Sequence, residues 1–127
     1  MREILFRGKR KDTGALETGS LVIVRGGCSD EQVFITDKMT GYCTPVIPET
    51  VGQYTGLTDK NGKKIFEGDI VNIEYLETTV KNAVIEYVGA SFYGSTDSDA
   101  CELDGYYQLE VIGNIHDNPE LLGRSNR

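Results

Sequence analysis

Three side chains of this 127-residue chain have the types and spacing to do chemistry: Asp59, Asp69 and His116. The two aspartates flank a predicted hairpin with Glu67 between them, so their carboxylates could converge. Paired carboxylates serve in acid–base catalysis or hold divalent cations, and an imidazole can act as a general base. A hydrolase or metal-dependent enzyme that uses these residues is therefore one hypothesis for the chain.

A structural role explains the same residues more simply. Asp59 stands where a turn begins, and there an aspartate side chain accepts hydrogen bonds from backbone N–H groups. Asp69 fits the same role before the next strand, and His116 precedes a predicted helix cap at the surface. We therefore favour the structural interpretation and expect no catalytic residue and no enzyme activity.

The cysteines give no metal or redox motif. Cys28, Cys43 and Cys101 are far apart, odd in number and without a C-x-x-C pair, so a zinc site that includes His116 would have irregular spacing. Phosphate-binding glycine loops are absent, and we expect no metal and no cofactor. Free thiols, no signal peptide and no membrane-length apolar run indicate a cytoplasmic protein.

The charge is acidic and unevenly distributed. Lys and Arg number 13 against 20 Asp and Glu, a net charge of −7, which disfavours sequence-independent binding to nucleic acid. Residues 1–11 are basic and residues 97–110 are acidic. These segments are either two solvated surfaces or complementary ends that meet between subunits or bind a charged partner.

A possible binding surface lies around the predicted hairpin. If Tyr54, Lys63 and Lys64 shared one face, single-stranded nucleic acid could stack there. Glu67 and Asp69 are further candidate binding residues. The seven tyrosines of the chain either pad a small core or form a contact surface for a protein partner. Binding to nucleic acid is the less favoured of these alternatives because the chain is acidic.

The elements that must position these residues are strands. Asn61-Gly62 between the strand candidates 53–58 and 64–66 predicts a hairpin with a type I′ turn, and 67–69 predicts a second turn. Alternating apolar residues predict three further strands, at 70–76, 83–88 and 107–115. The last strand has a candidate bulge at Gly113. It is followed by a helical turn capped by Asn118. Residues 89–105 are rich in Gly, Ser and Asp and predict a mobile loop.

The first half predicts a small antiparallel meander. Its strand candidates share short alternating or β-branched patterns and lie at 3–7, 21–24 and 32–36. Two prolines in 44–52, Pro45 and Pro48, predict a hinge in which 48–51 makes one helical turn.

These patterns define the expected fold class. It is mainly β, with an N-terminal β-meander subdomain (1–47) packed on a C-terminal SH3-like small β-barrel (48–127) that ends in a short helical turn. The barrel is expected because 67–71 resembles a loop-to-strand corner of SH3-like barrels. Such barrels carry many unrelated functions, so the fold alone names none.

Three separated pieces of the sequence carry a family resemblance: 2–7, 48–71 and 109–122. The last two contain Val-Gly-Gln-Tyr-Thr-Gly, Gly-Asp-Ile-Val and Ile-Gly-Asn-Ile in that order. The chain thus resembles the YopX family of phage and prophage proteins over most of its length. It departs from the family in lacking a Trp near its start, which bears on the N-terminal piece alone.

The resemblance implies a phage or prophage origin, a cytoplasmic setting in an infected bacterium and self-association. It supplies no catalytic residues. We therefore expect a non-enzymatic accessory protein that forms homo-oligomers and contacts an unidentified phage or host protein. The alternative is a regulator that binds nucleic acid through a small β-barrel.

Overall fold

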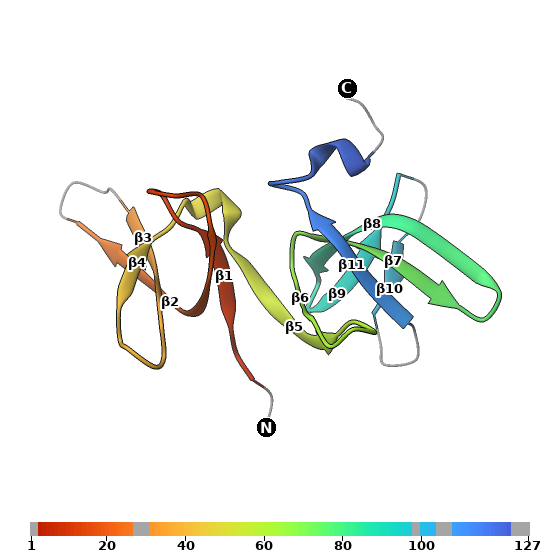
Figure 1. Cartoon of the computed structure of the whole chain (residues 1–127), viewed down its shortest axis with the longest axis horizontal. Helices are drawn as coiled ribbons and strands as arrows, with labels where there is room; N and C mark the ends of the chain where they lie inside the picture. Colours follow the sequence, from red (N-terminus) through yellow and green to blue (C-terminus); the bar gives the residue numbers. More distant parts are fainter. Residues whose placement is uncertain (1–2, 27–30, 98–99, 104–107, 123–127) are drawn as a thin grey trace. The chain divides into compact units, whose positions relative to one another are not determined.

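The computed structural model of the chain describes residues 3–26, 31–97, 100–103 and 108–122. They form two compact units, Met1–Tyr54 and Thr55–Arg127 (Figure 1). The expected mainly β fold is confirmed, in two antiparallel sheets. The division into subdomains 1–47 and 48–127 stays a prediction.

The first unit is the expected meander, drawn in red to yellow in Figure 1. Its strands pair in chain order and are β1 (Phe6–Lys9), β2 (Leu16–Arg25), β3 (Glu31–Thr36) and β4 (Cys43–Pro45). The predicted helical turn is the 3-10 helix η1 (Pro48–Thr50), and β1 also pairs with the start of β5 (Gly52–Thr58). Val33, Ile35 and Val46 form the core of this unit.

The second unit, green to blue in Figure 1, contains the end of β5, β6 (Lys64–Phe66) and a five-stranded sheet. The order of that sheet is β10-β9-β8-β7-β11. The bounds of its strands are β7 (Asp69–Tyr75), β8 (Thr78–Val88), β9 (Ser91–Ser95), β10 (Ala100–Glu102) and β11 (Gln108–Asn114). A 3-10 helix, η2, spans Pro119–Leu122.

Alternation along β7, β8 and β11 builds the core of the second unit. Val71, Ile73, Ala83, Ile85 and Leu109 are at most 3% exposed and pack together. These positions were expected to face one way from the alternation of their strands, and the bulge at Gly113 is confirmed by a register shift between Val111 and Gly113. The core of this unit is therefore predictable from period-2 patterning.

The prediction of a loop at 89–105 is wrong for most of the described residues of that segment, because Ser91–Ser95 and Ala100–Glu102 are strands. β9 pairs with β8 through a two-residue turn in which Gly89 and Ala90 both have positive φ, at 56° and 77°. β10 then pairs with β9. Gly94 lies within β9 because a Cβ there would stand 2.7 Å from Cδ1 of Ile73. Glycine at position 94 therefore permits close packing of β9.

The SH3-like barrel is not confirmed. Within the described residues one sheet has the order β4-β3-β2-β1-β5-β6 and the other has β10 and β11 at its edges, so neither closes on itself. β6 has only three residues, which leaves little ladder for closure.

Candidate functional site

The β5–β6 turn is organised by the carboxylate of Asp59. Oδ1 of Asp59 accepts hydrogen bonds from the backbone N–H groups of Asn61 and Lys63, each at 2.9 Å. The backbone closes the same turn, since the N–H of Gly62 donates to the carbonyl of Asp59 at 2.9 Å. Gly62 has φ +84°, whereas Asn61 is not among the described residues with positive φ. The predicted type I′ turn is therefore wrong, because an aspartate-nucleated turn takes its place.

The same carboxylate also reaches a distant strand. Oδ2 of Asp59 accepts the N–H of Val111 in β11 at 3.0 Å, and the N–H of Lys60 donates to the carbonyl of Leu109 at 2.8 Å. Nζ of Lys60 lies 3.8 Å from Oε1 of Glu110. The turn thus covers the edge of β11 that faces away from β7. We call these contacts the Asp59 clamp.

The environment of Asp59 sets its ionisation. Burial, which leaves Asp59 6% exposed, would raise the pKa of its carboxyl. The hydrogen bonds from Val111, Lys63 and Asn61 and the charge of Lys63 outweigh burial, so the pKa lies below its ordinary value of 3.8. Asp59 is therefore a stable anion at neutral pH and a poor general base.

Asp69 serves the next turn. It is 1% exposed, and its Oδ2 accepts the N–H of Phe66 at 2.8 Å. Between these residues Gly68 has φ +93°, donates its N–H to the carbonyl of Ile85 and accepts the N–H of Ile115. The expectation that Asp59 and Asp69 each satisfy backbone groups of a turn is thus confirmed.

His116 lies in the chain reversal after β11. Oδ1 of Asn114 accepts the N–H groups of His116 and Asp117 at 3.0 and 2.9 Å, and Oδ1 of Asn118 accepts the N–H of Asn114 at 3.2 Å. A Cβ on Gly113 would stand 2.7 Å from Oδ1 of Asn118, so this position excludes a side chain. The Gly-Asn-Ile-His-Asp-Asn sequence is therefore a folding motif.

Within the described residues, no three His, Cys, Asp or Glu side chains gather as a metal site. Asp59 and Asp69 have separate backbone partners in separate turns. The half-buried ring of His116 is near Gly68, since its Nε2 is 3.8 Å from where a Cβ on that glycine would stand. Cys28 lies outside the described residues.

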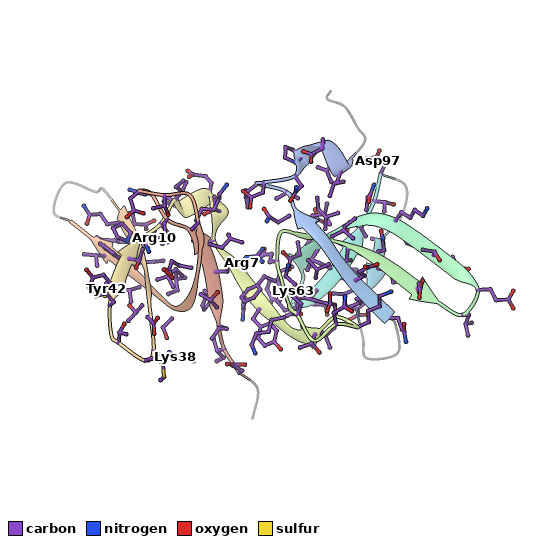
Figure 2. The ribbon with its side chains drawn as sticks, viewed as in Figure 1. Arg7, Arg10, Lys38, Tyr42, Lys63 and Asp97 are labelled. Atoms are coloured by element: carbon purple, nitrogen blue, oxygen red, sulfur yellow. The ribbon has the colours of Figure 1, made fainter. Side chains whose placement is uncertain are left out.

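The predicted binding residues differ in accessibility. Lys63 and Lys64 are exposed on the β5–β6 hairpin, and Figure 2 labels Lys63 there. Glu67 is half-buried, and Asp69 is inaccessible. Tyr54 is 7% exposed, which leaves its ring little surface on which a base could stack. Nucleic-acid binding at these residues stays a prediction.

A shallow cavity of about 290 Å³ opens on the second unit. It lies over the polar sides of β7, β8 and β11, and its charged lining residues are Lys60, Glu74, Lys81 and Glu110. These are two lysines and two glutamates, so the formal charge of the lining is balanced. The alternation of residues 70–76 predicts Asn72 and Glu74 on this polar face, but it does not predict a cavity.

Three consecutive apolar residues of β2 are exposed among the described residues, and the sequence did not predict their exposure. Val22, Ile23 and Val24 of β2 are 37%, 48% and 47% exposed, although all three are β-branched strand residues. A soluble protein rarely leaves such a run uncovered on a strand. The run itself was visible in the sequence, but its exposure depends on how far β1 extends along β2, and β1 pairs with residues 16–19 only.

The fold defines the class of the protein, which is mainly β and has two compact units. Asp59 and Asp69, which lie in its most specific sequence motifs, stabilise turns. The chain belongs to the YopX family, whose profile, described as YopX protein, matches residues 5–123. Its structure is similar to the crystal structure of YopX from Bacillus subtilis, with a TM-score of 0.56 and 18% identity over 96% of this chain and 99% of that one. A crystal structure of a protein from Enterococcus faecalis matches with a TM-score of 0.48 and 23% identity, over 96% and 99% of the two chains. A comparison with curated proteins finds no match.

Among the described residues, no helix is long and apolar enough to cross a membrane.

Proposed function

We propose that this protein is a phage or prophage accessory protein that acts in the cytoplasm by protein–protein contact, without catalysis, as a homo-oligomer. The observation that carries this proposal is the exposed apolar run of Val22, Ile23 and Val24. Contact with another protein surface would remove these side chains from water, at about 25 cal/mol per Å² of apolar area. The phage setting is what the family resemblance implies.

The family signatures support a role without catalysis. Asp59, Asp69 and Asn114 are buried, and a side-chain oxygen of each accepts hydrogen bonds from backbone N–H groups. Gly56, Gly62 and Gly68 have positive φ, so the signature glycines serve backbone conformation. These signature residues therefore stabilise the fold, and we expect the surface that contacts a partner to lie elsewhere in the chain.

Light scattering of the purified protein across salt concentration tests the proposal. We expect a defined oligomer at micromolar concentration that persists in high salt, because apolar contacts are not screened as ion pairs are. A monomer at every salt concentration that also retrieves no phage or host protein in a pull-down would contradict it.

A further inference from the structure

One strand edge in the first unit has no neighbour among the described residues. β1 pairs with residues 16–19 of β2, and β3 pairs with residues 20–25 from the other side. Beyond Gly19, the edge of β2 that continues the β1 side has no paired strand in the described part of the chain. Its backbone N–H and C=O groups are a template for another strand.

The side chains along this edge are apolar on both faces. Ile23 lies opposite the buried Val33 and is on the core side of the sheet, yet it is 48% exposed. Val22 and Val24 point to the other side, because side chains alternate along a strand. The core of the first unit is therefore open at Ile23, and strand addition would extend it.

The charges favour a second copy of this chain as the occupant. The first unit has seven Lys and Arg against seven Asp and Glu, a net charge of zero, whereas the second unit has six against thirteen, a net charge of −7. Two copies that meet through the first unit thus escape the repulsion that a contact between their acidic units would produce.

We propose, building on the proposed function, that residues 21–25 of β2 pair antiparallel with the same residues of a second copy, with Ile23 on the two-fold axis. In this register Ile23 lies opposite Ile23 of the second copy, and Val22 lies opposite Val24. Arg25 lies opposite Leu21, whose surface its aliphatic stem can cover. A parallel pairing would instead bring the two Arg25 side chains together, and like charges opposite each other are destabilising.

Disulfide formation tests the register. In a background with Cys28→Ser, Cys43→Ser and Cys101→Ser, the substitution Ile23→Cys places two thiols on directly opposed residues. Cβ atoms of such residues lie about 4.5–5.5 Å apart, close to disulfide distance. We expect mild oxidation to convert most of the protein to a covalent dimer. Ser20→Cys is the matched control on the same strand, since its two copies would lie about 20 Å apart.

Charge insertion tests the surface. Val22→Glu with Val24→Glu places like charges opposite each other in the proposed register, and we expect the concentration needed for association to rise about tenfold or more. Met39→Glu, at a turn residue that is 93% exposed, is the control and should keep the wild-type mass. Circular dichroism verifies that each variant retains the β fold.

The outcomes separate this inference from the proposed function. An oligomeric wild type whose Ile23→Cys variant does not cross-link, and whose Val22→Glu/Val24→Glu variant keeps its mass, overturns the inference and leaves the proposed function standing. A wild type that is monomeric at all concentrations removes self-association from both. Monomeric wild type that loses a captured partner in the Val22→Glu/Val24→Glu variant assigns the edge to a different protein and likewise overturns the inference.

Discussion

The outer edges of β11 and β2 differ in whether another part of the described chain covers their backbone N–H and C=O groups. Beyond its pairing with β7, β11 receives the Asp59 clamp, which gives the N–H of Val111 and the carbonyl of Leu109 partners within the chain. β2 beyond Gly19 has no such cover in the described residues and carries exposed Val22, Ile23 and Val24. Protected edges keep a unit monomeric and bare edges invite another strand, so the comparison locates where association is available.

The difference lies in the residues that each region places beside its edge. The β5–β6 turn supplies an acceptor, Asp59, that is held ionised by three backbone N–H groups. Around β2, the charged groups form local pairs instead: Arg10 with Asp12 and Arg25 with Glu31, both at 2.9 Å. Exposed pairs of this kind contribute little stability and leave the edge uncovered.

Removal of the clamp is the largest expected effect. Asp59→Ala leaves three backbone N–H groups without their acceptor, and we expect the free energy of unfolding to fall by about 3 kcal/mol. Urea denaturation of the full chain measures this loss. Asp12→Ala, which removes an exposed carboxylate, is the control and should change stability little. Equal effects for the two variants would mean that the clamp does not protect the β11 edge.

The pH dependence sharpens the same contrast. Because folding lowers the pKa of Asp59 below 3.8, its contribution to stability is present above that value and is lost as pH falls through the folded pKa. We expect the stability difference between the wild type and Asp59→Asn to shrink as pH is lowered from neutral to below 3.8. The pKa of Asp12 is also lowered, through its hydrogen bond with Arg10, but Asp12 is present in both proteins and cancels. A difference that stays constant with pH would contradict an ionised clamp.

The turn glycine gives the smallest effect. Gly62→Ala places a Cβ at φ +84°, and we expect a loss of about 1 kcal/mol together with faster amide exchange at Val111. Asn61→Ala is the matched neighbour and should change little, because its backbone N–H, not its side chain, bonds Asp59. Comparable losses at both positions would contradict this assignment, because they would indicate that both residues need positive φ, as in a type I′ turn.

Local pattern was sufficient to predict much of the fold. Alternation predicted β7, the core positions of β8, and the meander of the first unit, and Asn61-Gly62 predicted the position of the β5–β6 hairpin. The turn type was missed because it depends on which side chain accepts the backbone N–H groups. The strand β9 was missed because a glycine within a segment rich in Gly, Ser and Asp usually indicates a loop. The reason for glycine at position 94, which is its close contact with Ile73, depends on the tertiary structure.

Only the contacts between residues close in sequence were predictable at the candidate site. The role of Asp59 and Asp69 at turns follows from their positions, but the hydrogen bond between Asp59 and Val111 joins residues 52 positions apart and has no local signal. The exposure of Val22 to Val24 was likewise hidden, because β-branched runs usually indicate a buried strand. Long-range pairing decides both features.

The β5–β6 turn also contains a sequence that is prone to deamidation, Asn61-Gly62. In an Asn-Gly pair, the backbone nitrogen of glycine can attack the carbonyl carbon of the asparagine carboxamide and expel ammonia, which yields a succinimide that water opens to aspartate or isoaspartate. Here the N–H of Gly62 donates to the carbonyl of Asp59, and this holds the attacking nitrogen in place. The carboxylate of Asp59 holds the turn in which this hydrogen bond forms, through the N–H groups of Asn61 and Lys63. Asp59→Ala keeps the backbone carbonyl but loosens the turn, so we expect mass spectrometry of stored protein to show faster deamidation of Asn61 in this variant than in the wild type.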